Sequence, residues 1–252
     1  MTLEGRVAFV SGGSRGIGRA IALGLAADGA DVAINYRRDA ESAAETVAEI
    51  EALGRRAAAY AADVADHDQN AAMAEAVLAD FEAVDILVHN AGVASRGGSV
   101  VRTQPDEVHK LFDTHAFGAW SLAHLFLPSM RTRERGDIVF ISSAAVVYMA
   151  GNSAPYNMAK SALEALAWTL AKEERSKGTH VNVVAPGLVD TEMGRRLVKG
   201  AMGVDDIHSL DAGSSFGHVC TPEEVADAVR WLVSDRASYV TGQRIGVDGG
   251  AF

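Results

Sequence analysis

Short apolar runs alternate along the chain with longer segments in which apolar residues recur at helical spacing. The short runs predict buried strands and the longer segments predict helices. The predicted strands span residues 6–10, 32–36, 57–61, 86–89, 138–142, 181–185 and 244–247. The predicted helices span residues 16–28, 40–53, 69–81, 105–131, 154–177 and 222–234.

This alternation predicts an α/β fold, in which a doubly wound, seven-stranded parallel sheet is flanked by helices on both faces. Two helix starts carry cap signals. Asp68 precedes the helix at 69–81, and Thr221 is followed by Pro222 and two acids. No linker, low-complexity tract or solenoid repeat divides the chain, so we expect a single domain over residues 1–252.

The first predicted strand runs into the sequence SGGSRGIG, residues 11–18, which leads directly into a helix. Glycines let the backbone approach a pyrophosphate, and the start of a helix offers free N–H groups to negative charge. Ordinary turn chemistry is the alternative, but the position favours a nucleotide and hence a Rossmann-like domain. The spacing GxxxGxG is one residue longer than the dinucleotide fingerprint. The predicted phosphate-binding residues are Gly12, Ser14, Arg15, Gly16, Ile17 and Gly18.

A second stretch carries a hydroxyl, a phenol and an ammonium at Ser143, Tyr156 and Lys160. Tyr156 and Lys160 are four residues apart and share one face of the helix at 154–177. An ammonium beside a phenol is expected to lower the phenol's pKa, and a serine hydroxyl can hydrogen-bond a substrate oxygen. Such a pair also arises by chance, so its catalytic interpretation depends on the rest of the chain.

Composition limits the partners of the protein. The 252 residues are 48% hydrophobic with a formal net charge of −10, and no basic run is longer than an arginine pair. Nucleic acid and anionic membranes are therefore not expected as main partners. Cys220 is the single cysteine and the histidines form no zinc pattern, so we expect neither a disulfide nor a metal. No leader or 18-residue apolar stretch is found, which predicts a cytoplasmic protein.

The end of the second predicted strand bears on the choice of dinucleotide. An acid there would hydrogen-bond the ribose hydroxyls of NAD and repel a 2′-phosphate. Tyr36 occupies this position, Arg37 follows it, and Arg15 is a second cation for the phosphate. The arginines are alternatively solvated charges, and Asp39 offers an acid just beyond the strand. We expect NADP(H) to be favoured over NAD(H).

Together these motifs resemble the short-chain dehydrogenase/reductase family from about Gly5 to Gly250. Within it the chain is most similar to the 3-oxoacyl-[acyl-carrier-protein] reductase group, which uses NADPH to reduce a ketone to a hydroxyl. Members that act on sugars, steroids, cyclic ketones and acyl groups share these motifs. The motifs that carry the resemblance are SGGSRGIG, HNAG at 89–92, Ser143, YNMAK at 156–160 and PG at 186–187.

The resemblance implies a role for each of these residues. Ser143 would hold the carbonyl oxygen, hydride from the nicotinamide would attack the carbon, and Tyr156 would protonate the alkoxide. Lys160 would bind the nicotinamide ribose and tune Tyr156. The other implied cofactor contacts are Tyr36 and Arg37 at the 2′-phosphate, Asp63 and Val64 at the adenine, Asn90, Ala91 and Gly92 beside the cofactor or at the sheet centre, Pro186 and Gly187, and Val189 and Thr191 at the nicotinamide amide.

One catalytic position departs from the family pattern. The family usually has an Asn there, in a pattern like vNxxG, which helps to hold a water in the proton path to the lysine. This chain has His115 in that place. The histidine keeps such a path, titrates near pH 6.5, or is a packed helix residue.

The resemblance places a substrate lid at about residues 190–220, and this stretch lacks sharp periodicity. SFGH at 215–218 stands where the reductase group often has Pro-Leu-Gly-Arg. The alternatives are a 3-oxoacyl thioester reductase, a short-chain alcohol, polyol or small cyclic ketone dehydrogenase, and a low-activity NADP-binding scaffold or sensor. The apolar lid residues form either a substrate wall or the packing of the lid itself; they are Met193, Leu197, Met202, Val204, Ile207, Leu210 and Phe216.

Two kinds of protein partner are also expected. An acidic acyl carrier protein would dock on cations near the mouth of the site, and the candidates are Arg131, Arg133, Arg135 and Lys177. Solvated charges at helix ends are the alternative for these residues. The helices at 105–131 and 154–177 have apolar surface to spare, and the family pairs them across a dimer interface. We therefore expect a homotetramer.

Overall fold

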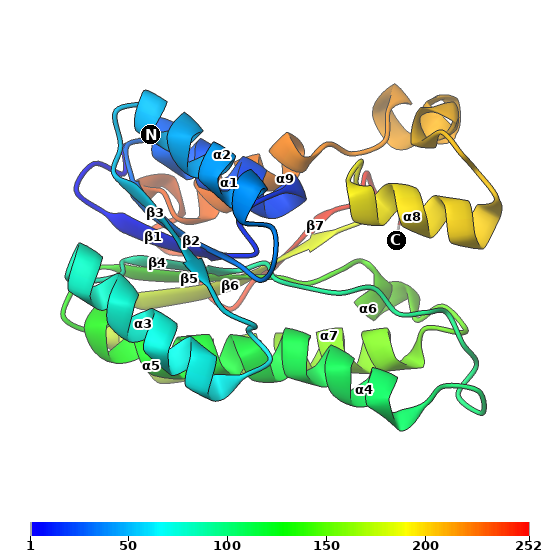
Figure 1. Ribbon diagram of the computed structural model, residues 1–252, viewed down its shortest axis with the longest axis horizontal. Helices are drawn as coiled ribbons and strands as arrows, with labels where there is room; N and C mark the ends of the chain where they lie inside the picture. Colours follow the sequence, from blue (N-terminus) through cyan, green and yellow to red (C-terminus); the bar gives the residue numbers. More distant parts are fainter. Residues whose placement is uncertain (1, 252) are drawn as a thin grey trace.

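Seven parallel strands form one sheet in the computed structural model, which describes residues 2–251. The strand order is β3-β2-β1-β4-β5-β6-β7, so the winding reverses between β1 and β4 (Figure 1). The predicted doubly wound α/β fold is confirmed. The strands are β1 (Val7–Ser11), β2 (Asp31–Tyr36), β3 (Ala57–Ala61), β4 (Ile86–His89), β5 (Gly136–Ile141), β6 (Thr179–Pro186) and β7 (Arg244–Val247).

Helices cover both faces of the sheet (Figure 1). One face carries α1 (Gly16–Ala27), α2 (Ala40–Ala52) and α9 (Pro222–Leu232). The other carries α3 (His67–Phe81), α4 (Pro105–Phe112), α5 (Gly118–Met130) and α7 (Ala154–Glu174). Beyond the carboxyl ends of the strands lie α6 (Ala145–Tyr148) and α8 (Glu192–Met202). Within residues 2–251, a search for a helix of the length and apolarity needed to span a bilayer finds none.

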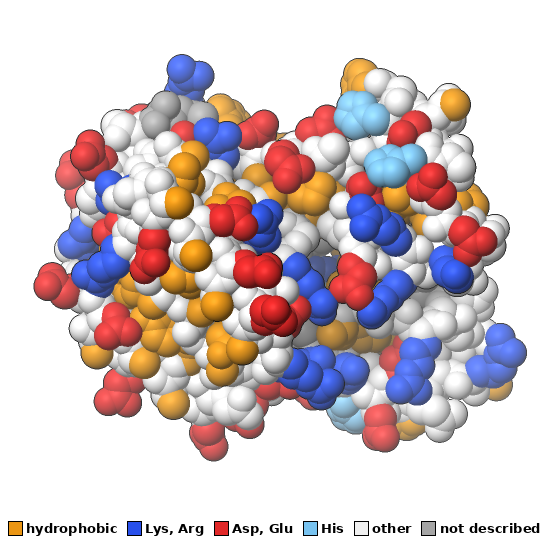
Figure 2. Space-filling view, turned by 45° about the horizontal axis from the view of Figure 1, so that its top comes forward, with side chains coloured by type: hydrophobic (Ala, Val, Ile, Leu, Met, Phe, Trp, Pro, Cys, Tyr) orange, Lys and Arg blue, Asp and Glu red, His pale blue; other side chains and the backbone are white. Residues whose placement is uncertain are grey.

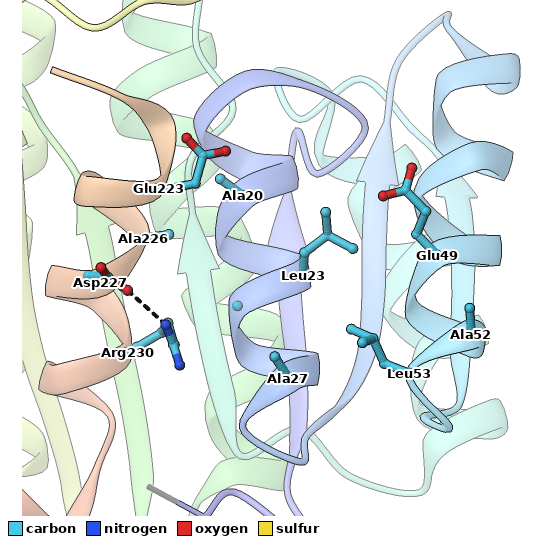
Figure 3. Close-up of a pocket in the computed structure, with 11 residues that line it drawn as sticks. Ala20, Leu23, Ala27, Glu49, Ala52, Leu53, Glu223, Ala226, Asp227 and Arg230 are labelled. Atoms are coloured by element: carbon cyan, nitrogen blue, oxygen red, sulfur yellow. Dashed lines mark hydrogen bonds and ion pairs between the residues drawn. The ribbon is translucent and has the colours of Figure 1, made fainter. Parts of the chain in front are cut away.

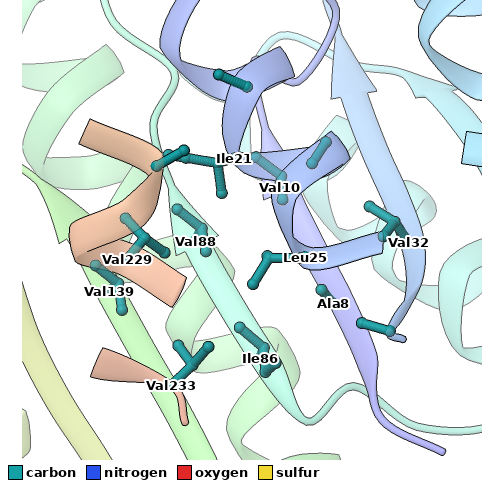
Figure 4. Packing of buried hydrophobic residues seen from close by; sticks show 14 of the residues in the cluster. Ala8, Val10, Ile21, Leu25, Val32, Ile86, Val88, Val139, Val229 and Val233 are labelled. Carbon is teal, nitrogen blue, oxygen red and sulfur yellow. The ribbon is translucent and has the colours of Figure 1, made fainter. Parts of the chain in front are cut away.

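The five inner strands are buried on both faces because each helical layer packs on them, whereas the edge strands β3 and β7 are only partly buried. Successive residues of a strand point to opposite faces, so Phe9 and Val10 of β1 enter different cores. Val10 and Val88 belong to the core under α1 and α9, which also contains Leu25 (Figure 4). Phe9 belongs to the other core, where its ring centroid lies 4.8 Å from that of Phe126 in α5. This two-sided burial explains why the strands are continuous apolar runs.

The helix predicted at 105–131 is confirmed in extent but is not a uniform α-helix. The segment forms α4, a π-helical stretch at Asp113–Phe117, and α5. A side chain on Gly118 would come within 2.8 Å of the carbonyl oxygen of Val64, so the chain passes close to the backbone after β3 at this point. The wider π-helical turn sets the position of His115, because that residue lies within it.

The segment that begins at residue 192 also differs from expectation. It forms α8, an eleven-residue helix that buries Gly194 and Val198 on one side and exposes its arginines and lysine. The two glycines inside the helix and its high charge obscured the periodicity in the sequence.

Helix caps correct one prediction and confirm another. Asp66, rather than Asp68, caps α3, because its carboxylate accepts from the backbone N–H groups of Asp68 at 3.0 Å and Gln69 at 3.2 Å. Thr221 and Glu224 form a complete capping box at the start of α9, as the sequence predicted.

Replacing the cap of α3 tests this assignment. We expect Asp66→Ala to lower Tm by about 2–4 °C, because two backbone donors lose their acceptor. Asp68→Ala is the matched control and should change Tm less, since Asp68 only faces the helix dipole. Thermal unfolding followed by circular dichroism measures both, and a larger effect of Asp68→Ala would contradict the assignment.

Candidate active site

The carboxyl ends of four central strands carry the predicted site. β1 ends at the glycine turn, β4 ends before Asn90, β5 ends two residues before Ser143, and β6 ends at Pro186. Because the strands are parallel and hydrogen-bonded to one another, these ends lie along one edge of the sheet. Doubly wound folds bind ligands at this edge, where the strand order reverses.

The glycine turn depends on close backbone contacts. Gly12 and Gly16 have φ angles of 62° and 55°, in the left-handed region that favours glycine. A methyl group on Gly18 would overlap the carbonyl oxygen of Gly12 and the amide of Asn90. Asn90 Nδ2 donates to the carbonyls of Ser11 and Gly12, each at 3.1 Å. The sequence left two roles open for Asn90, beside the cofactor or at the centre of the sheet, and these hydrogen bonds support the second.

The first turn of α1 is suited to an anion. Arg15 occupies the N-cap position, and in the described chain this turn has neither a side-chain cap nor an acid. Its N–H groups therefore remain for a ligand, and the helix dipole favours negative charge there. Arg15 itself pairs with Glu192 of α8 at 2.8 Å. Ser14 is buried behind the turn, and Gly16 and Ile17 begin the helix. The cradle fits the pyrophosphate of a dinucleotide.

The end of β2 presents a cation rather than an acid. Tyr36 ends the strand, and Arg37 lies 3.5 Å from Asp63 in an exposed ion pair. Asp39 is turned away into the cap of α2, where it accepts from the backbone N–H of Ser42 at 3.1 Å and from its hydroxyl at 2.9 Å. These bonds, the backbone one first, lower the pKa of Asp39. Asp39, the acid just beyond β2, is therefore engaged as the cap of α2.

The remaining predicted cofactor residues surround the same edge. Thr191 caps α8 by accepting from the N–H of Gly194 at 3.0 Å, and its methyl lies 3.3 Å from the side-chain position of Gly16. Ala91 Cα lies 3.1 Å from the side-chain position of Gly12. The start of the lid therefore lies against the glycine turn. The other predicted members are Val64 after β3, Gly92 after β4, and Pro186, Gly187 and Val189 at and after the end of β6.

Ser143, Tyr156 and Lys160 meet at the start of α7. Pro155 lies in the first turn of this helix, so Tyr156 follows at once and Lys160 stands one turn later. The Ser143 hydroxyl interacts with the Tyr156 phenol and favours its ionised form. Lys160 Nζ lies 5.9 Å from the centre of the Tyr156 ring and donates to the carbonyl of Ile141 at 2.7 Å. The fold brings the predicted acid, its tuner and its orienter together.

Burial dominates the ionisation of both titratable groups. It raises the pKa of Tyr156, and the hydrogen bond with Ser143 opposes this rise. It lowers the pKa of Lys160 to about 7, against the favourable charge of Glu164. The predicted lowering of the phenol pKa is therefore wrong for this arrangement, because burial is the larger effect and the ammonium is directed to Ile141. Lys160 instead changes its charge near neutral pH.

His115 is buried, and its ring stands edge-on to that of Tyr156 with centroids 5.4 Å apart. Its Nε2 lies 2.9 Å from the carbonyl oxygen of Val93 and 3.3 Å from the backbone nitrogen of the same residue, so it can donate to the first or accept from the second. Nδ1 is buried and has no hydrogen-bond partner among residues 2–251. Burial first, and the charge of Lys160 second, hold the pKa of His115 well below its ordinary value. Titration near pH 6.5 is therefore wrong, while a packed neutral histidine and a proton path both remain compatible.

A buried ion pair beneath the site was missed in the sequence. Glu164 is 2% exposed, and its carboxylate lies 3.1 Å from Arg244 Nε of β7. Glu164 follows Lys160 by four residues, so the spacing that linked Tyr156 to Lys160 also placed Glu164 on that face. The partner is 80 residues away in the chain, and no local pattern points to it.

The lid divides its apolar residues into two groups. Val204, Ile207 and Leu210 pack with Val198 and Val219 in a small core, so packing of the lid is the alternative that holds for them. The others face solvent above the site and remain for contact with a ligand. These four, each at least 45% exposed, are Met193, Leu197, Met202 and Phe216.

The cations predicted to receive a carrier protein lie far from the site. Each pairs with a buried carboxylate at the amino ends of the strands or at the far end of α7, so this prediction is wrong. The reason is that the loops before β5 and β6, which carry these cations, belong to the opposite edge of the sheet. The pairs are Arg131 and Lys177 with Glu174, Arg133 with Asp85, and Arg135 with Asp137.

Two hollows differ in their relation to the site. A groove of about 480 Å³ lies between α1, α2 and α9 and is lined by residues such as Leu23, Leu53 and Arg230 (Figure 3). It lies on the outer side of the helical layer and reaches the C-terminal ends of α1 and α2, away from Ser143. Figure 2 shows another hollow between the α1–α2 side and the α8 side, with both basic and acidic side chains around it.

The fold and the site together define a class of protein, the dinucleotide-dependent oxidoreductases with a Ser-Tyr-Lys site on a doubly wound sheet. A family model described as Enoyl-(Acyl carrier protein) reductase matches residues 12–251. The chain belongs to the short-chain dehydrogenase/reductase family, as the resemblance predicted.

Individual relatives match the whole chain. The 3-oxoacyl-[acyl-carrier-protein] reductase FabG of Escherichia coli (strain K12) is 34% identical, over 100% of this chain and 99% of that protein. Among solved structures, a short chain dehydrogenase from Burkholderia cenocepacia J2315 in complex with NADP has a TM-score of 0.90 and 34% identity, covering 100% and 99% of the two chains. L-Sorbose reductase from Gluconobacter frateurii, complexed with NADPH and L-sorbose, has a TM-score of 0.91 and 31% identity, covering 99% and 97%.

A methyl group at Gly18 tests the glycine turn. We expect Gly18→Ala to weaken dinucleotide binding by about tenfold or more, because overpacking against Gly12 and Asn90 opens the cradle. Gly213→Ala is the control, since a methyl there meets nothing within 4 Å. Titration of NADPH and NADH fluorescence measures both variants. Equal affinities for Gly18→Ala and wild type would show that the turn does not hold the dinucleotide.

Proposed function

We propose that the protein is an NADP-dependent oxidoreductase that transfers hydride between the nicotinamide and a carbonyl or secondary alcohol, with a 3-oxoacyl thioester as the leading substrate. The observation that carries the proposal is the convergence of Ser143, Tyr156 and the buried side chain of Lys160 at the start of α7. A hydroxyl and a phenol at one point suit an oxygen that gains negative charge during the reaction.

The reduced bond is a C=O rather than a C=C bond. The description of the family model names an enoyl reductase, whereas the name of the Escherichia coli relative specifies a 3-oxoacyl group. Ser143 and Tyr156 both carry O–H groups that can donate to one oxygen. A carbonyl oxygen that becomes a hydroxyl needs such donors at the reacting atoms, so we favour the carbonyl.

Each side chain has a task in the proposed reduction. When bound, the nicotinamide supplies the hydride. Ser143 donates a hydrogen bond to the substrate oxygen, and Tyr156 delivers a proton to that oxygen as negative charge develops. Lys160 stabilises the phenolate that remains and holds the nicotinamide ribose. Val189 and Thr191, before α8, orient the nicotinamide amide.

NADP(H) is the proposed cofactor in preference to NAD(H). Arg37 follows the end of β2, and Arg15 stands in the glycine turn. Each arginine now pairs with an exposed carboxylate, Arg37 with Asp63 and Arg15 with Glu192. Because exposed ion pairs contribute little to stability, both arginines are available to a 2′-phosphate. Asp39 is occupied as a helix cap. The neighbouring structures with bound NADP and NADPH agree with this choice.

Two substrate classes fit the proposal. The names of the curated relatives favour a 3-oxoacyl group on an acyl carrier protein, and the exposed apolar lid residues suit an acyl chain. An alcohol, polyol or small cyclic ketone is the second candidate, which the similarity to L-sorbose reductase favours. We also infer a homotetramer, since Phe117, at the end of the π-helical stretch, and Trp120 of α5 stack on the surface at 39% and 44% exposure.

A substrate panel tests the activity. Purified protein with NADPH is assayed against 3-oxoacyl thioesters, a 2-enoyl thioester, L-sorbose and small ketones. We expect reduction of the 3-oxoacyl thioesters, and Tyr156→Phe should lower kcat/KM by about 10²–10⁴-fold while NADPH still binds, because the proton donor is lost. Turnover of a ketone alone would favour the second candidate. Tight NADPH binding without reduction of any carbonyl would instead favour a scaffold or sensor.

Cofactor choice is tested at Arg37. We expect Arg37→Ala to raise the Kd for NADPH by about 10–100-fold and to leave the Kd for NADH unchanged, because a charge-assisted bond to the 2′-phosphate is lost. Arg19→Ala is the control, since Arg19 pairs with Glu49 on the outside of α1. Equal weakening of both dinucleotides would contradict a contact with the 2′-phosphate.

A further inference from the structure

Three consecutive residues, the last of β5 and the two that follow it, are each hydrogen-bonded by a Lys, Glu or Arg side chain. The carbonyl of Ile141 accepts from Lys160 Nζ at 2.7 Å. The hydroxyl of Ser142 donates to Glu164 Oε1 at 2.6 Å. The carbonyl of the third residue, Ser143, accepts from Arg244 Nη2 at 3.2 Å. The segment that carries the Ser143 hydroxyl is therefore held by a different side chain at each of these three residues.

Glu164 and Arg244 join these contacts into one network. Arg244 Nε lies 3.1 Å from the same Glu164 oxygen that accepts from Ser142, so one carboxylate connects α7, β7 and the end of β5. The side chains of Glu164 and Arg244 are only 3% and 20% exposed. Charge-assisted hydrogen bonds in such a shielded place are strong and hold their geometry.

We propose that Glu164 and Arg244 are positioning residues for the carbonyl site, which together orient Ser143 and stabilise the ammonium of Lys160. This inference rests on the proposed function. Neither side chain touches the reacting atoms in it: Arg244 acts through the backbone of Ser143, and Glu164 acts through Ser142 and through its negative charge near Lys160.

The charge of Glu164 matters because few other groups around Lys160 ionise near neutral pH. His89 of β4 and His115 of the π-helical stretch both interact with Lys160, and burial lowers the pKa of each, to about 3 for His89. Tyr156 on α7 has a raised pKa. These three groups are uncharged at pH 7, so Glu164 is the negative charge that keeps Lys160 protonated.

Removing the charge of Glu164 should shift the pH dependence of activity in a known direction. Glu164→Gln keeps an oxygen for Ser142 but lowers the pKa of Lys160, which then loses its proton at lower pH. We expect the falling limb of kcat/KM for carbonyl reduction to move to lower pH by about one unit. Activity lost at pH 7.5 should therefore return in part at pH 6. A purely structural defect would not recover in this way.

The same helix provides a matched control. Glu174 at the end of α7 is 1% exposed and pairs with Arg131 at 2.6 Å, so Glu174→Gln removes an equally buried, arginine-paired carboxylate. It lies ten residues, or about 15 Å, beyond Glu164 along the helix axis. We expect Glu174→Gln to lower Tm without moving the pH profile. Identical profiles for Glu164→Gln and Glu174→Gln would overturn the proposal.

Two further variants separate orientation from charge and guard against misfolding. Arg244→Lys keeps the charge but lacks the forked donors, so kcat should fall about tenfold while the pH limb stays in place. Glu164→Leu combined with Arg244→Leu removes both charges without leaving either unpaired. This double variant should fold, as checked by circular dichroism, and show the shifted limb together with the lower kcat. A folded double variant with the wild-type profile would overturn the proposal.

A binding readout distinguishes this inference from failure of the proposed activity. Wild-type protein that reduces no carbonyl would overturn the proposed function. In that case the Kd for NADPH as a function of pH still reports on Lys160, which is proposed to hold the ribose. Its midpoint should move to lower pH in Glu164→Gln and remain in place in Glu174→Gln; an unmoved midpoint in Glu164→Gln would overturn the role of Glu164.

Discussion

The buried ammonium of Lys160 is the constraint on which the site depends. A charged amine in the protein interior is strongly disfavoured unless acceptors surround it, and Lys160 is 4% exposed. The chain supplies the carbonyl of Ile141 at 2.7 Å and the carboxylate of Glu164 one helical turn away. The contact with Ile141 requires α7 to pack on the end of β5 in one position, whereas Glu164 stands on α7 itself. The packing of this helix therefore sets the charge of the lysine.

Neutral side chains around the lysine serve the same purpose. His89 and His115 are almost fully buried, and desolvation is the main cause of the lowered pKa of each. Two additional positive charges would destabilise the ammonium, so keeping these rings neutral leaves Lys160 free to ionise near pH 7. His115 also contacts the ring of Tyr156 edge-on. The substitution of a histidine for the usual Asn is thus compatible with a site that works near neutrality.

Local pattern predicted much of the fold and of the candidate site, and its failures have identifiable causes. Short apolar runs mark strands both in the buried centre of the sheet and at its half-buried edges, so β3, β4 and β7 were placed with the boundaries that the structure gives them. The break around His115 was missed because a π-helical turn keeps helical periodicity on both sides. Asp68 was predicted as the cap of α3 in place of Asp66. Aspartate is a good cap at either position, and only the backbone geometry decides which of the two caps the helix.

The sequence by itself determined the order of elements, the glycine turn and the Ser143, Tyr156 and Lys160 set, because these depend on neighbours within a few residues or on a family motif. Tertiary structure alone decided which charges act together. It paired Glu164 with Arg244 across 80 residues, and it placed Arg133 and Arg135 at the edge of the sheet opposite the site. It also decided that burial, which raises the pKa of Tyr156, dominates the ionisation of this phenol. Electrostatic interactions depend on distance and desolvation in space, and neither quantity is encoded in local spacing.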